Sequence, residues 1–179
     1  MGARFFLGVM FFTGGMSKLI PFPGVMGPVW LEEVLQPHGL GPYARFVAWS
    51  ELLIGVLLFS RRFATIGAVM MVPLIVNILA VVTSMEWRGT PYVVSGFLVM
   101  NVYLIWYDRD RLLTLVTDGT RGPAYGSWTP DTPAVVGIAL SLAGPHLYGI
   151  HPVIGYGAIG LGLLGLLATP LLHRRASTA

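Results

Sequence analysis

The chain has 179 residues, of which 55% are hydrophobic and only 11% are charged, and its formal net charge is +3. Soluble domains carry about 25% charged residues, so this composition argues against a soluble enzyme or a free nucleic-acid-binding protein and indicates an integral membrane protein. The chain contains no cysteine, which excludes disulfides, thiolate metal sites, iron–sulfur clusters and thiol relays carried by its own residues.

Six apolar segments approach the length of about 20 residues that a helix needs to cross a bilayer. In chain order they cover residues 5–20, 43–60, 63–85, 92–107, 133–147 and 153–172. The first segment is short, and no Ala-x-Ala cleavage motif follows it, so we expect it to be retained as a span. Pro73 lies in the middle of the third segment and is expected to kink that helix.

Positively charged residues divide unevenly between the two sides that six spans would define. With both termini on the cytoplasmic side, eight arginines face the cytoplasm, whereas Lys18, Arg45 and Arg88 face outward. Cytoplasmic loops of membrane proteins are enriched in Lys and Arg. We therefore predict an all-α polytopic membrane bundle of six transmembrane helices in a prokaryotic inner membrane, with both termini cytoplasmic.

A Gly-, Pro- and Thr-rich segment over residues 114–132 separates four predicted spans from two. We expect a four-helix membrane core over residues 1–113, a cytoplasmic linker over 114–132, and a two-helix hairpin with a short basic tail over 133–179. Within the longest outer loop, residues 29–35 are expected to form a short interfacial helix.

Polar side chains inside the predicted spans are costly in a membrane and are therefore functional candidates. Lys18 in the first span and Glu51 in the second lie at similar depths, so we expect them to meet as an ion pair. Asn77 lies in the third span, four residues after Pro73. Two interpretations stay open. In the favoured one, these residues fix helix packing; in the other, they line a polar pocket that binds a quinone head group or another small ligand.

Histidines provide only weak evidence for a metal or pigment site. His38, His146 and His151 all map to the outer side, but their spacing matches no metal-ligand motif. His146 and His151 are the weak candidates, His146 as an axial ligand to haem or pigment. No cofactor motif is recognisable, so a quinone or pigment is expected only with the help of partner subunits.

Small residues form one face of the last predicted span. Gly155, Ala158, Gly162, Gly165 and Thr169 follow one another at intervals of 3, 4, 3 and 4 residues, which places them on one helix face. Such a face lets another helix backbone approach closely. The neighbour is either another helix of this chain or a transmembrane subunit of a larger complex.

The first two predicted spans share a pattern of glycines and charged residues. It consists of Arg4, Gly8, Gly14, Gly15, Lys18 and Leu19 in the first span, and Glu51, Gly55, Leu57, Leu58 and Arg61 in or after the second. With this pattern, the N-terminal block over residues 1–113 resembles the DoxX family of small membrane proteins. The resemblance implies a four-helix membrane core, a link to quinone-coupled electron transfer, and Lys18 and Glu51 at the family's polar positions. The last two spans depart from this four-helix core.

On this basis we expect an accessory transmembrane subunit of a membrane-bound electron-transfer complex that contacts quinone and is not catalytic alone. Its partners would be membrane lipid and other transmembrane subunits. The alternatives are a free-standing quinone-linked membrane oxidoreductase and a carrier of small solutes or lipids.

Overall fold

A computed structural model describes residues 2–23, 29–60, 63–116 and 132–176 of the chain. In these ranges the regular structure is entirely helical, as predicted. The helices are α1 (Gly2–Leu19), α2 (Leu31–Leu35), the 3₁₀ turn η1 (Gln36–His38), α3 (Gly41–Phe59), α4 (Ala64–Ser84), α5 (Thr90–Tyr107), α6 (Arg109–Val116), α7 (Thr132–Tyr148) and α8 (Pro152–Ala176).

Three of these helices, α3, α4 and α5, are long and apolar enough to cross a membrane. Their length and composition fit an integral membrane protein. The apolar part of α8, Pro152–Ala168, is shorter, and α1 and α7 do not join the three. The count of six spans therefore stays a prediction.

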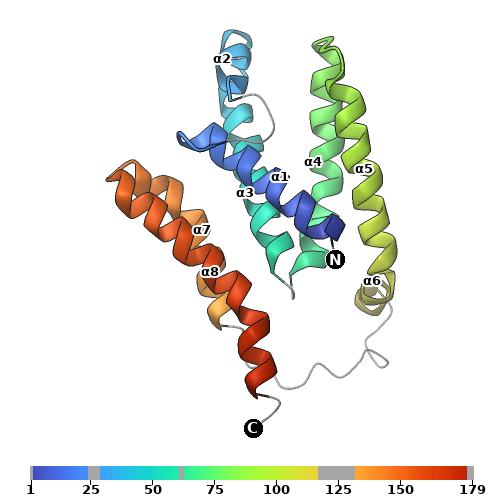
Figure 1. The fold of residues 1–179 in the computed structure, drawn as a ribbon. Helices are drawn as coiled ribbons and strands as arrows, with labels where there is room; N and C mark the ends of the chain where they lie inside the picture. The colour runs from blue at the N-terminus through green and yellow to red at the C-terminus, as the bar shows by residue number, and fades with distance from the viewer. Residues whose placement is uncertain (1, 24–28, 61–62, 117–131, 177–179) are drawn as a thin grey trace.

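Helix α3 lies at the centre of the molecule (Figure 1). Helix α1 crosses it obliquely, the α4–α5 hairpin lies on one side, and the α7–α8 hairpin lies on the other. The crossing depends on glycine. A Cβ at Gly15 would lie 2.5 Å from the backbone nitrogen of Leu52, and a Cβ at Gly55 would lie 2.5 Å from that of Phe12. Because neither glycine carries a side chain, the two helix backbones pack directly against each other.

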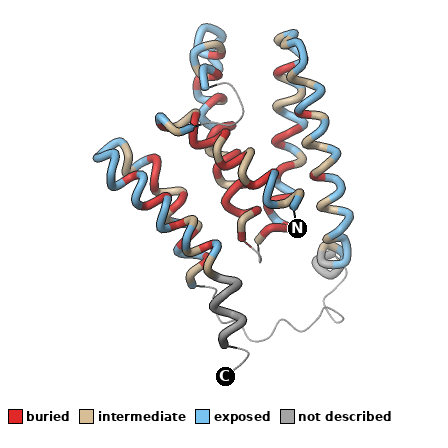
Figure 2. The backbone as a smooth tube through the Cα atoms, viewed as in Figure 1, coloured by how far each residue is buried: buried red, intermediate tan, exposed pale blue. Residues whose placement is uncertain are grey.

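Two apolar clusters hold the helices together, and their buried residues concentrate along α1 and α3 (Figure 2). The first cluster contains residues from each of the five helices α1, α2, α3, α4 and α5, among them Leu7, Ile54 and Met71. The second joins α1 and α3 to the C-terminal hairpin and includes Leu52 and Leu166. The hairpin therefore docks against the same two helices that form the centre of the N-terminal bundle.

The small-residue face of α8 packs against α7 of the same chain. A Cβ at Gly162 would collide with Ser141 and would lie 2.7 Å from the carbonyl oxygen of Gly137, and one at Gly155 would lie 2.6 Å from Tyr148. Ala158 on the same face is buried, and a Cβ at Gly165 would lie 3.3 Å from the Pro133 carbonyl oxygen. The side chain of Thr169 lies outside the described residues. Of the two predicted neighbours, the structure therefore shows the intramolecular one for the described residues of this face.

The described helices include one, α6, that lies outside the predicted segments. Helix α6 was not predicted, and it extends to Val116, into the expected linker; residues 117–131 of that linker lie outside the described ranges. The charges at its start end the apolar helix α5, which stops at Tyr107, and α6 begins directly after Asp108, whose carbonyl accepts the backbone N–H of Leu112 at 3.2 Å. The short helix expected within residues 29–35 is present as α2.

Candidate ligand-binding cavity

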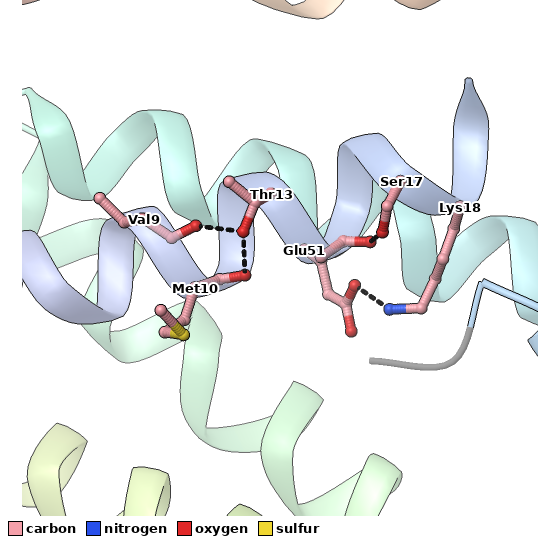
Figure 3. A network of polar contacts seen from close by, with 7 residues as sticks. Val9, Met10, Thr13, Ser17, Lys18 and Glu51 are labelled. Atoms are coloured by element: carbon pink, nitrogen blue, oxygen red, sulfur yellow. Dashed lines mark hydrogen bonds and ion pairs between the residues drawn. The ribbon is translucent and has the colours of Figure 1, made fainter. Parts of the chain in front are cut away.

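Lys18 and Glu51 form the expected ion pair (Figure 3). The ammonium group of Lys18, next to the end of α1, donates to Oε2 of Glu51 in the middle of α3. The side chains are only 6% and 10% exposed. The close α1–α3 crossing at Gly15 brings the two groups together, so the pair is a consequence of the glycine contact as well as of helix depth.

The hydroxyl groups of Thr13 and Ser17, which lie near the ion pair on α1, donate hydrogen bonds to backbone carbonyls of α1 itself. Ser17 donates to the carbonyl of Gly14 at 3.0 Å, and Thr13 donates to that of Val9 at 2.8 Å (Figure 3). Among the described residues, the pair uses one of the three ammonium donors and one of the two carboxylate oxygens. It therefore has both donor and acceptor capacity left for a further group.

The ion pair lies in the wall of a partly open cavity of about 540 Å³ that is lined by residues of α1, α2, α3, α4 and α5. Most of the wall is apolar and is formed by side chains such as Phe11, Val47 and Ile78. Polar groups reach it at few positions, among them the Lys18–Glu51 pair and Tyr43. A mostly apolar wall with a few polar groups is the usual lining of a small-molecule site.

One end of the cavity is lined by two tryptophans from different elements. The rings of Trp30, beside α2, and Trp87, between α4 and α5, both line the cavity and meet edge-on with centroids 5.1 Å apart. Helix α2 is also tied to α3 by Arg45 and Glu32, whose nitrogen and oxygen lie 2.7 Å apart. This second ion pair is far more exposed than the first.

Asn77 is not among the residues that line the cavity, and its place in a ligand pocket with the ion pair stays a prediction. On α4 the cavity-lining residues are Ile75, Ile78, Val81 and Val82, and Asn77 lies about one helical turn before Val81. Instead, Asn77 acts on the cavity indirectly: its Oδ1 accepts a hydrogen bond of 2.7 Å from the Tyr43 hydroxyl.

Comparison with known proteins adds one relative. No family model and no solved structure matches the chain. Over 122 residues the chain is 30% identical to the "Uncharacterized protein YwoB" of Bacillus subtilis (strain 168), and the match covers 62% of this chain and 77% of that protein. The chain belongs to the YwoB family. Membership in the YwoB family assigns no ligand, so the functional evidence comes from the cavity and its residues.

In this member of the YwoB family, His146 and His151 each contact another residue of the chain. The ring of His146 stacks on Trp49 of α3 with centroids 4.8 Å apart and an interplanar angle of 20°. Nδ1 of His151 accepts the backbone N–H of Val153 at 3.3 Å, at the start of α8. Within the described ranges, His, Asp and Glu residues form no group of three suited to a metal ion.

Further polar contacts that the sequence analysis missed lie between α4 and α5. Asn101 is fully buried, and its Nδ2 donates to the carbonyl of Ala68 at 2.9 Å. Nearer the α6 end, Thr65 donates to Asp108 at 2.9 Å. An asparagine in an otherwise apolar span was the signal that pointed to the first contact. These bonds join the hairpin and do not reach the cavity wall.

Proposed function

We propose that this member of the YwoB family is an accessory transmembrane subunit of a membrane-bound electron-transfer complex and that its cavity holds a quinone. One observation carries the proposal: a buried ion pair lies in the wall of a mostly apolar cavity of about 540 Å³. That volume falls within the range of about 300–1,000 Å³ typical of small-molecule sites.

The residues of the cavity fit both parts of a quinone. The Lys18 ammonium group can donate to a carbonyl oxygen of the head group, and Glu51 can accept a hydrogen bond from a hydroxyl group of its reduced form. Such bonds are stronger in a poorly hydrated site than in water. The apolar walls suit the hydrocarbon tail. The expected resemblance of residues 1–113 to the DoxX family, which is linked to quinone-coupled electron transfer, implies the same ligand class.

The accessory role is supported by the sequence. The chain has no cysteine and no recognisable cofactor motif, so we assign the electron-carrying cofactor to a partner subunit. The proposal includes α1, α7 and α8 as spans beside α3, α4 and α5, with both termini cytoplasmic in a prokaryotic inner membrane. Successive long helices run in opposite directions through the molecule (Figure 1), as such a topology requires.

Isolation of the native chain from its membrane in a mild detergent tests this proposal. We expect it to co-purify with a subunit whose absorption spectrum shows a redox cofactor, and we expect quinone in an organic extract of the preparation. Recovery of the chain alone and free of quinone would contradict the proposal. Quinone turnover by the purified single chain would favour a free-standing oxidoreductase, and solute flux in liposomes would favour a carrier.

A further inference from the structure

Helix α1 passes from one side of the bundle to the other as it crosses α3. Near its middle, the ring of Phe11 meets that of Phe97 on α5 edge-on, with centroids 6.0 Å apart. Just after its end, the backbone carbonyl of Pro21 accepts a hydrogen bond from the Tyr156 hydroxyl of α8. The helix therefore contacts α5 at its middle and the C-terminal hairpin at its end, so its second half leads away from α5 (Figure 1).

The cavity lies in the wedge that this divergence leaves between α1 and α5. The residues that line the cavity from α1 lie between Met10 and Lys18. Those that line it from α5 lie between Thr90 and Phe97, in the first half of that helix. The contact of Phe97 with α1 closes the narrow end of the wedge, and the wedge widens from there toward α2.

The wedge, rather than the α2 end, is the open side of the cavity. At the α2 end Trp30 is 46% exposed, but its ring is in contact with that of Trp87, and the ion pair of Glu32 with Arg45 ties α2 to α3. Val93 lines the cavity from α5 and is nevertheless 49% exposed. It therefore lies at the rim, where the cavity meets the outer surface of the bundle.

An opening on this side faces hydrocarbon and not water. In the proposed topology α1 and α5 are both spans, so the wedge between them lies inside the bilayer, in its outer half. Met10, Val93 and Phe97 line the wedge with apolar side chains. The Lys18–Glu51 pair lies inward of this rim, because its side chains are at most 10% exposed. A ligand whose polar group reaches the pair would leave its apolar part in the wedge.

We propose that the ligand enters the cavity from the bilayer through the wedge between α1 and α5, and that its hydrocarbon chain stays there while its head group bonds to the Lys18–Glu51 pair. The inference rests on the proposed quinone site and adds the place of the tail and the side of entry. Met10, Val93 and Phe97 form the tail subsite. The ligand is therefore a membrane-dissolved amphiphile, and a head group without a chain binds less tightly.

A photoreactive probe locates the tail without any variant. The probe is a decylubiquinone analogue with a diazirine near the middle of its chain, added to the full-length chain in proteoliposomes, and mass spectrometry identifies the labelled residues. We expect labels at Met10, Val93 or Phe97 that disappear when decylubiquinone is added in excess. If decylubiquinone binds but the labels it displaces lie at Trp30 or Trp87, or if it displaces none, the inference is overturned.

Val93→Trp provides an independent test, because a large ring at the rim fills the wedge and leaves the ion pair unchanged. We expect it to weaken decylubiquinone binding several-fold and to leave binding of 2,3-dimethoxy-5-methylbenzoquinone, the same head group without the chain, nearly unchanged. Val99→Trp is the matched control, since Val99 is a 70% exposed residue of α5 that does not line the cavity, and it should change neither. Equal effects of Val93→Trp on both probes, or none, would overturn the inference and leave the quinone site standing. If wild-type protein binds neither probe, the proposed function fails.

Discussion

The buried pair of Lys18 and Glu51 allows a test that separates packing from ligand binding. Lys18→Met and Glu51→Gln each remove one charge and leave the other in a site where both side chains are at least 90% buried. Breaking a buried pair typically costs about 3–5 kcal/mol, whereas replacing both partners is often nearly neutral. We therefore expect each single variant to lower the free energy of unfolding by about that amount and the double variant to recover most of it.

Unfolding in mixed detergent micelles, followed by circular dichroism for the four proteins of the cycle, measures these differences. The chain carries its own control, because Arg45 and Glu32 form an ion pair whose side chains are 70% and 37% exposed. Arg45→Met and Glu32→Gln should each change stability by less than about 1 kcal/mol, as exposed pairs do. Additive losses for Lys18→Met and Glu51→Gln would show that the two charges do not interact, and the account of the site would then be wrong.

Three further predictions concern packing and topology. Gly162→Leu should separate α7 from α8 and lower the free energy of unfolding by about 1–3 kcal/mol. Gly160→Leu should be nearly neutral, because a Cβ at this position would meet nothing within 4 Å. Equal thermal shifts for the two variants would contradict the packing of this face. His146→Ala removes the ring stacked on the tryptophan of α3, and we expect thermal unfolding to report a loss of about 0.5–1.5 kcal/mol, while an unchanged stability would show that the stack contributes nothing. In intact cells, an impermeant thiol reagent should label a cysteine at His38 but not one at Asp110, and the reverse pattern would refute the orientation.

The sequence was sufficient to predict the ion pair because charge inside an apolar span is rare and expensive. Lys18 and Glu51 stand out against apolar neighbours, and their depths follow from counting residues. The cavity beside them was not predictable in the same way. Its walls come from five helices whose relative positions depend on close contacts such as the one at Gly15, and single-residue patterns do not determine such crossings.

Other features needed the structure for different reasons. Tyr43 resembles the tyrosines common at membrane interfaces, and only the packing of α3 against α4 shows that it lines the cavity and bonds to Asn77. The small-residue face of α8 was visible from its spacing, but spacing cannot tell whether the neighbour belongs to the same chain. The contact of Gly162 with Ser141 and Gly137 answers that question.

Quinone binding by the Lys18→Met, Glu51→Gln double variant tests the central claim most directly. Stability should be close to wild type, so a loss of affinity cannot be attributed to unfolding. We predict that decylubiquinol and decylubiquinone bind wild-type protein in a titration and that binding of both is lost or strongly weakened in the folded double variant, because the pair's charged donors and acceptor are gone. A double variant that is folded and binds both probes as tightly as wild type would contradict the claim that this ion pair recognises the head group.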